Sequence, residues 1–364
     1  MRVPLFPSPT MAWYVGKAFM IRTFAIMALL VVVLLALDLL GESGKIFAVP
    51  GNGTPELMKY MGLRVPQLVS RFLPFSVLLG TLVTFITLNQ NSEVVSMKAA
   101  GMSAHQILAP LILCGAIVAL ISFAFNERVV ARANAALDVW QKVDYGTIPP
   151  DPGYKTNVWI RHDSNLVHAG VVRGVAPNIT LSDITIYNRT EGALNSLITA
   201  QTARSLPDGW RIVDATRFDT RTGVSTKLGT IEAAKGVSPE QFTLANIDGD
   251  NLSFFPLKHA INQLKVAGRP TAALEGTLWH KLSGPLSAVL MPLLGAVAAF
   301  GLARSGKLFV RAIIGMALGF AYFVADNFAI AMGNLGAYPP WLAAWGPFLL
   351  FAIIGELVLL RTEE

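Results

Sequence analysis

The chain has 364 residues, of which 53% are hydrophobic and 14% charged, with a net charge of +6 and a mean hydropathy of +0.52. Several uncharged runs approach bilayer length, so the composition indicates an integral membrane protein and excludes an ordinary soluble chain. The single cysteine, Cys114, lies in an apolar run, which excludes a disulfide framework and a thiolate metal site.

The N-terminal residues predict a short interfacial helix and then a first membrane span at 19–40. Ser8 and Pro9 suit the N-cap and N1 positions, and Trp13 and Tyr14 suit the headgroup region. A cleaved signal peptide is the alternative. We reject it because the run is long for such a segment and no small-residue cleavage site follows it.

A loop is expected at 41–65, a second span at 72–88 and a third at 107–125. Ser103 and Gln106 form a capping-box pattern just before the third span. The second and third spans are therefore separated by a short polar stretch.

This polar stretch predicts a short amphipathic helix at 92–100. Ser92 is the expected N-cap, Glu93 lies in the first turn where the helix dipole favours an acid, and Gly101 suits the C′ position. Such a helix between two spans offers a contact for a soluble partner. An ordinary connecting loop is the alternative.

Between residues 126 and 269 charges become frequent and apolar residues alternate with polar ones. The segments 179–187 and 210–218 have the alternation of half-buried strands, and turn signals recur about every ten residues. A helical continuation is expected at 126–143 and a returning helix at 256–267. The strands predict a sandwich, jelly roll or similar antiparallel domain.

Three further spans are predicted at 282–302, 310–334 and 341–360, which places both termini on one side. The cations on that side fit the positive-inside rule and make it cytoplasmic: Arg2, Lys17, Arg22, Lys98, Arg304, Lys307, Arg311 and Arg361. We therefore expect the helix at 92–100 in the cytoplasm and the strand domain across the membrane from it.

The expected fold is thus a multi-pass α-helical membrane protein with six transmembrane helices and an antiparallel β domain, jelly-roll-like, inserted between helices three and four. The expected domains are the first three helices at 1–126, the β domain at 127–270 and the last three helices at 271–364.

Motifs for catalysis are sparse. The stretch 301–307 has the spacing of a phosphate-binding loop, but Leu308 replaces the expected Ser or Thr and the loop follows a span rather than a strand. The five histidines show no metal-ligand spacing, and no nucleophile motif is evident. We expect no catalysis by this chain alone.

Ionisable residues inside spans are a better signal, because burying an unpaired charge in hydrocarbon costs several kcal/mol. Asp38 and Asp326 both lie toward the outer leaflet, Glu356 lies near the inner face, and His280 and Lys281 begin the fourth span. One interpretation is a polar, partly hydrated flank that binds charged headgroups. The alternative is pairing between helices.

The chain resembles the lipopolysaccharide export permeases of the LptF/LptG family over nearly its whole length. Four local patterns carry the resemblance: SEVVSMKAAG at 92–101, LWHKLSGP at 278–285, YFVADNF at 322–328, and Pro339-Pro340 with WGP at 345–347. The pattern at 322–328 is closer to the G-type subunit than to the F-type.

The resemblance implies a permease subunit of an ABC transporter in the bacterial inner membrane, with a periplasmic β domain. It would extract lipopolysaccharide from the outer leaflet of that membrane and pass it to a periplasmic bridge toward the outer membrane. Its partners would be a homologous permease, a cytoplasmic ATPase dimer and periplasmic β-jelly-roll bridge proteins, with no nucleic acid involved. This chain would hold no cofactor, since ATP and magnesium would bind the ATPase.

The resemblance also implies that 92–100 is the coupling helix, with Glu93 meeting a basic groove on the ATPase. The proposed coupling residues are Ser92, Glu93, Val94, Met97, Lys98 and Gly101.

The sequence departs from the family at the outer end of the first span, where the expected cations are missing. Cations that could contact the lipid phosphates instead are Lys45, Lys59, Arg64, Arg132 and Lys281. Two other functions remain open at this point: an ion-coupled secondary transporter, and a membrane-anchored scaffold or sensor.

Overall fold

The computed structural model describes residues 8–148, 154–162, 165–175, 178–190, 193–206, 209–234, 236–237, 239–243, 248–266, 269–300 and 308–361. The chain forms two compact units. One comprises residues 1–147, 249–254 and 272–364, and the other comprises residues 148–248 and 255–271. The predicted phosphate-loop pattern at 301–307 lies outside the described residues.

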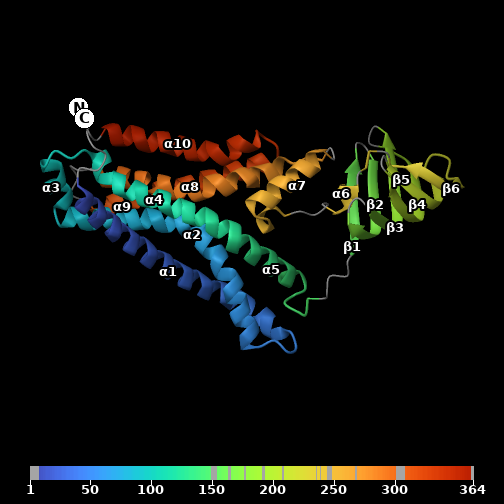
Figure 1. Ribbon diagram of the computed structural model, residues 1–364, viewed down its shortest axis with the longest axis horizontal. Coiled ribbons are helices and arrows are strands. Elements are labelled where there is room, and N and C mark those ends of the chain that lie inside the picture. The colour runs from blue at the N-terminus through green and yellow to red at the C-terminus, as the bar shows by residue number, and fades with distance from the viewer. Residues whose placement is uncertain are drawn as a thin grey trace. The chain divides into compact units, whose positions relative to one another are not determined.

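The first unit is helical (Figure 1). Its described helices are α1 (Pro9–Ala48), α2 (Thr54–Gln90), α3 (Glu93–Ala99), α4 (Ala104–Phe125), the π-helical turn η1 (Asn126–Val130), α5 (Ala131–Lys142), the 3-10 turn η2 (Gly249–Asn251), α8 (Ala272–Phe300), α9 (Leu308–Asn334) and α10 (Pro340–Arg361). The continuation of the third span as η1 and α5 confirms the helix predicted at 126–143.

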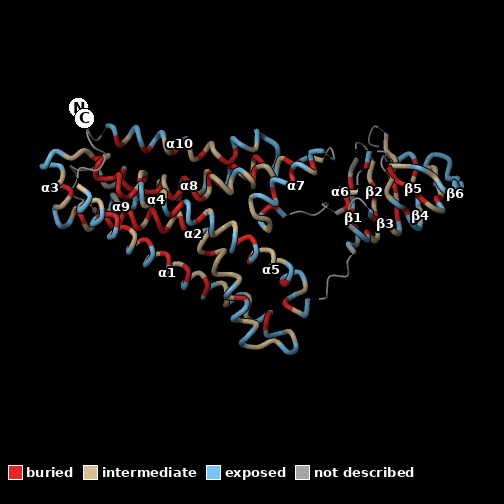
Figure 2. Tube along the Cα trace, viewed as in Figure 1, coloured by how far each residue is buried: buried red, intermediate tan, exposed pale blue. Residues whose placement is uncertain are grey.

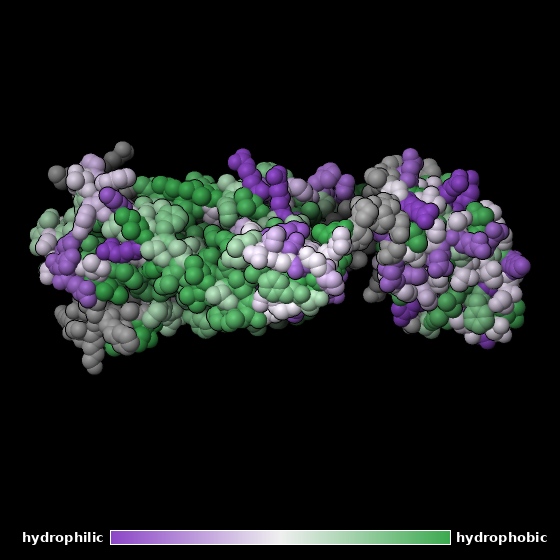
Figure 3. All heavy atoms as spheres, turned by 90° about the horizontal axis from the view of Figure 1, so that it is seen from below, coloured by the Kyte–Doolittle hydropathy of each residue, from purple (hydrophilic) through white to green (hydrophobic). Residues whose placement is uncertain are grey.

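Five helices in the described part of the chain are long and apolar enough to cross a membrane: α1, α2, the continuous helix Ala104–Lys142, α9 from Ile313, and α10. The remaining predicted span is α8, whose 29 residues pack against α2, α4, α9 and α10. Figure 3 shows the broad hydrophobic surface of this helical unit. The helical unit therefore has the architecture of a multi-pass membrane protein.

Two predicted boundaries near the N-terminus are wrong. The expected interfacial helix is the first part of α1, which begins at Pro9 with the Ser8 hydroxyl accepting a hydrogen bond from Met11 N at 3.4 Å. The expected loop at 41–65 is largely helical, since only residues 49–53 separate α1 from α2. The apolar windows therefore marked the central part of α1 and the C-terminal half of α2.

Helix α8 lies at the centre of the bundle, and Figure 2 shows buried positions where α2, α4 and α8 meet. The contact between α4 and α8 depends on Gly115. A Cβ at this residue would lie 2.5 Å from the carbonyl oxygen of Ala288, which belongs to the α8 backbone and cannot rotate away. Gly115 thus sets the distance between the two helices.

We expect Gly115→Ala to destabilise the helical unit by about 2 kcal/mol, because the added methyl overpacks the α4–α8 contact. The matched control is Gly41→Ala on α1, where a Cβ would meet nothing within 4 Å. There the exchange should be neutral or slightly stabilising, since alanine is the better helix former. Thermal unfolding of both variants in detergent measures the difference, and equal melting temperatures would contradict the role of Gly115.

The second unit contains a six-stranded antiparallel sheet whose strands follow one another in the order β1 to β6. The elements of the strand domain and the helix that leads out of it are β1 (Tyr154–His162), β2 (Asn165–Val175), β3 (Asn178–Thr190), β4 (Ala193–Leu206), β5 (Gly209–Asp219), β6 (Ser225–Ala233), α6 (Pro239–Thr243) and α7 (Phe254–Val266). The strands predicted at 179–187 and 210–218 are β3 and β5. This confirms an antiparallel β domain between the third and fourth long helices.

Alternation along the strands builds the core of this domain. Ile160 pairs with Val167, and Val167 pairs with Ile186, so that three buried side chains line one face across β1, β2 and β3. The unit begins at Ile148 rather than at the predicted residue 127, because the chain remains helical through Lys142.

Candidate functional site

Helix α3 lies between the second and third long helices, as predicted, and spans Glu93–Ala99. Its C-terminus is a Schellman motif. Gly101, with φ of +85°, donates to Lys98 O at 2.9 Å, and Met102 N donates to Met97 O at 3.2 Å. The prediction for Gly101 is confirmed, because this backbone conformation favours glycine.

The start of α3 differs from the prediction. Ser92 occupies the N-cap position but has a φ of 59°, and its side chain makes no capping hydrogen bond. Its backbone oxygen instead accepts hydrogen bonds from the Ser96 amide and hydroxyl, at 3.0 and 3.1 Å. The capping box predicted for the next helix is confirmed, since Ser103 and Gln106 exchange hydrogen bonds of 3.2 and 3.1 Å.

Helix α3 is anchored to the bundle on one side. Val94 is only 4% exposed and belongs to the apolar core, against which Met97 also packs. Between them lies Val95, whose side chain is 64% exposed. A force applied to α3 would therefore be transmitted to the long helices through buried apolar contacts.

The predicted coupling acid is held at the exposed start of α3. Glu93 Oε1 accepts hydrogen bonds from the Tyr14 hydroxyl at 3.2 Å and from Asn91 Nδ2 at 3.1 Å. The carboxylate thus has a fixed position at the positive end of the helix dipole. Lys98, also among the proposed coupling residues, is exposed in the last turn.

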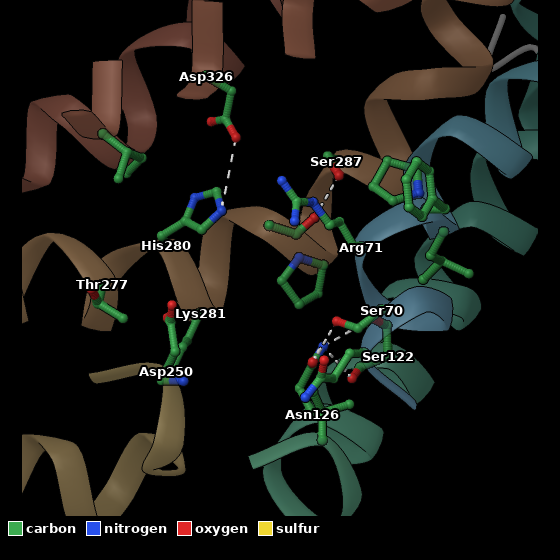
Figure 4. A pocket seen from close by; sticks show the side chains of 18 of the residues that line it. Ser70, Arg71, Ser122, Asn126, Asp250, Thr277, His280, Lys281, Ser287 and Asp326 are labelled. Carbon is green, nitrogen blue, oxygen red and sulfur yellow. Dashed lines mark hydrogen bonds and ion pairs between the residues drawn. The ribbon is translucent and has the colours of Figure 1, made fainter. Parts of the chain in front are cut away.

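The second feature is a polar cavity of 810 Å³ in the helical unit, formed by α2, α4, η1, α5, η2, α8 and α9. Figure 4 shows that its polar side chains come from helices far apart in the sequence. These lining residues include Ser70, Arg71, Ser122, Asn126, Glu127, Asp250, Thr277, His280, Lys281, Ser287, Asp326 and Asn334. The π-helical turn η1 supplies Asn126, which accepts from the Ser70 hydroxyl at 2.6 Å.

Helix α3 lies at one end of the long helices, and α5, which lines the cavity, lies toward the other end (Figure 1). Arg71 is 19 residues from Gln90 in α2, His280 is 20 residues from Phe300 in α8, and Asp326 is 18 residues from Leu308 in α9. At 1.5 Å per residue each is about 30 Å from the α3 end. The three side chains therefore lie at one level, in the half of the bundle away from α3.

Two cationic side chains line the cavity, Lys281 from α8 and Arg71 from α2. Arg71 is exposed and forms no ion pair with any residue that the structure describes. Sequence reasoning missed it because it directly precedes the predicted second span and looked like an ordinary flanking charge. An arginine that lines a cavity can donate bidentate hydrogen bonds to a phosphate.

The acidic side chains around the cavity differ in the hydrogen bonds that they accept. Glu127 accepts a hydrogen bond from Phe254 N at 2.6 Å, and Asp138 accepts from Lys142 and Asn251 at 2.6 and 3.0 Å. Asp326 is only 9% exposed, and its nearest ionic contact is His280 Nε2, 3.8 Å from Oδ2. Its Oδ1 has no hydrogen-bond partner among the described residues.

Asp38, the other acid predicted near the outer leaflet, pairs between helices. Its two carboxylate oxygens accept hydrogen bonds of 2.9 and 3.0 Å from the Arg64 guanidinium of α2, and Oδ2 also accepts from the Tyr60 hydroxyl at 2.6 Å. The sequence left open whether Asp38 belongs to a headgroup-binding flank or pairs between helices. The structure shows the pair between helices.

The five cations proposed for headgroup binding do not gather in one place. Lys281 lines the cavity, whereas the other four are absent from its lining. Lys45 pairs with Glu42 at 2.9 Å, the Lys59 ammonium lies 4.3 Å from the centre of the Trp140 ring, Arg64 pairs with Asp38, and Arg132 is exposed on α5. The cavity therefore combines one predicted cation with one that sequence reasoning missed.

The ends of α1 and α2 that meet at residues 49–53 are hydrogen-bonded to the segment that follows α5. The Tyr145 hydroxyl donates to Glu42 at 2.6 Å, and Asn52 Nδ2 donates to Tyr145 O at 2.9 Å. Burial raises the pKa of Tyr145 to about 12, so the phenol remains protonated and keeps donating at neutral pH. This contact fixes where the chain leaves the helical unit.

The chain matches a known family and known relatives over most of its length. Residues 13–361 match the family described as "Lipopolysaccharide export system permease LptF/LptG". The chain is 28% identical to the lipopolysaccharide export system permease protein LptG of Escherichia coli K12 over 83% of this chain and 84% of the relative. It is 25% identical to the LptG protein of Haemophilus influenzae over 98% and 99% of the two chains. With a family match that extends over both compact units, this chain belongs to the LptF/LptG family of permeases.

Proposed function

We propose that this chain is the permease subunit of an ABC transporter that removes lipopolysaccharide from the outer leaflet of the bacterial inner membrane. The observation that carries the proposal is a single helical bundle with the anchored helix α3 at one end and a polar cavity in the other half. A family whose relatives are named for lipopolysaccharide export supports the substrate.

In this proposal α3 is the cytoplasmic coupling helix, and a separate ATPase dimer docks on it. Glu93 meets a basic groove on the ATPase, while Val94 and Met97 transmit the movement to the bundle through their buried contacts. ATP and magnesium bind the ATPase. The β domain then lies in the periplasm, consistent with the predicted topology.

The cavity holds the lipid headgroup. Arg71 and Lys281 donate to its phosphates, since charge-assisted hydrogen bonds to phosphate are strong in a partly dehydrated site. A second, homologous permease completes the cavity wall, and closure of the pair expels the lipid toward the β domains.

The lipid leaves over a bridge of similar β domains. Strand β6 is an edge of the described sheet and is largely exposed, whereas the other edge strand, β1, is packed by α6. An edge strand has unpaired backbone groups that can pair with a further strand. We propose β6 as the edge that extends this bridge.

Purification of the tagged chain from its native membrane tests the proposal. We expect a second permease and an ATPase to co-purify, and mass spectrometry to identify bound lipopolysaccharide. A secondary transporter or a scaffold would purify without the ATPase. Nucleotide hydrolysis by the isolated chain would contradict the proposal.

A further inference from the structure

The buried carboxylate of Asp326 lines the cavity and accepts no hydrogen bond from any residue that the structure describes. Figure 4 shows it extending from α9 toward His280 on α8, with Arg71 of α2 in the same region. Oδ1 is buried without a hydrogen-bond partner among the described residues, and the 3.8 Å contact between Oδ2 and His280 is too long for a hydrogen bond. Burying such a group is unfavourable unless a donor satisfies it.

The charges around Asp326 indicate what that donor is. Arg71 and Lys281 line the same cavity, and the lipid of the proposed function carries phosphates that they can bind. A ligand that also satisfies Asp326 must carry a positive group close to its negative one. An ammonium group attached through a short linker to a phosphate has this arrangement.

Two other donors fit less well. A sugar hydroxyl could donate to Oδ1 but would leave the negative charge of the carboxylate uncompensated. A divalent cation needs several oxygen ligands, and no group of three or more acidic, histidine or cysteine side chains suited to a metal occurs among the described residues. An ammonium supplies both the charge and the N–H donors.

We propose that Asp326 is a specificity-determining residue that binds an ammonium group on the phosphate of the transported glycolipid, while Arg71 and Lys281 bind the phosphate itself. The assignment rests on the proposed function and adds to it a preference between two forms of the transported lipid. The transporter then favours lipopolysaccharide whose phosphates carry an amino substituent over lipopolysaccharide with free phosphates. His280 is a competitor for the same carboxylate.

The test compares two lipids on the complete transporter in lipid nanodiscs. The probes are lipopolysaccharide with phosphoethanolamine on its phosphates and the same lipopolysaccharide with free phosphates, each displacing a fluorescent lipopolysaccharide. Asp326→Asn should weaken binding of the amino-substituted lipid by about tenfold, the value of one charge-assisted hydrogen bond. Binding of the lipid with free phosphates should remain unchanged or improve.

Two variants separate this role from a structural one. Glu356→Gln is the matched control, because Glu356 also pairs with a histidine across two helices, His105 at 2.8 Å, but does not line the cavity. It should leave the ratio of the two affinities unchanged. His280→Gln removes the competitor and should raise the affinity for the amino-substituted lipid.

The outcomes separate the inference from the proposed function. Equal effects of Asp326→Asn on the two lipids, or no effect on either, would overturn the role of Asp326 and leave lipid export intact. Failure of the unmodified transporter to bind either lipid would overturn the proposed function and the inference with it.

Discussion

Replacing Glu93 with lysine is expected to abolish both ATPase association and lipid export while the chain remains folded. The residue lies at the exposed start of α3 and makes only side-chain contacts with Tyr14 and Asn91, so its loss does not disturb the core. Charge reversal opposite a basic groove costs about 3 kcal/mol, which is about a hundredfold in affinity. The amount of ATPase that co-purifies with the variant measures the effect.

The control for this prediction places a lysine at the exposed Gln90, just before α3. Gln90→Lys also makes the cytoplasmic surface more positive but leaves the helix intact, and it should retain the ATPase. Normal export by Glu93→Lys would show that α3 does not couple through this acid. Loss of the ATPase in both variants would show an unspecific charge effect.

The second large effect is expected from reversing the cavity cations. Arg71→Glu and Lys281→Glu should each lower lipopolysaccharide affinity by tenfold or more, because each loses a charge-assisted hydrogen bond worth about 2 kcal/mol and gains repulsion from the phosphate. The double variant should lose binding altogether. Displacement of a fluorescent lipopolysaccharide from the purified transporter measures both.

Lys258→Glu on α7 is the charge-matched control, since its side chain is exposed and does not line the cavity. Its lipid affinity should equal that of the unmodified protein. The headgroup site would have to lie elsewhere if the Arg71 and Lys281 variants also bound lipid normally. Arg132 would then be the next residue to replace, because it is exposed on α5, one of the helices that line the cavity.

Local signals in the sequence predicted the parts of the structure that depend on neighbouring residues. Gly101 ends α3, and the capping box of Ser103 and Gln106 begins α4. Both could be predicted because their hydrogen bonds join residues at most five positions apart in the sequence. The periodicity that marked the strands at 179–187 and 210–218 is local as well. The prediction that the Ser92 side chain caps α3 is wrong. Its backbone is left-handed, and its main-chain oxygen accepts the hydrogen bond from Ser96 N instead.

The cavity could not be predicted because it depends on contacts between distant segments. Arg71, Lys281 and Asp326 come from three helices, and nothing in their local sequence shows that they line one space. The same holds for Asp38, whose partner Arg64 belongs to the next helix and had been considered for lipid binding. Hydropathy placed these charges near the outer leaflet without indicating which of them pair and which face the cavity.

The central claim is that movement delivered at α3 empties a cavity about 30 Å away. A photoreactive amino acid in place of Gln67, which lines the cavity, tests it directly in vesicles that contain the complete transporter and lipopolysaccharide. We expect cross-links to lipopolysaccharide in the absence of nucleotide and their loss when ATP is hydrolysed. Cross-links that persist unchanged during ATP hydrolysis would contradict the claim.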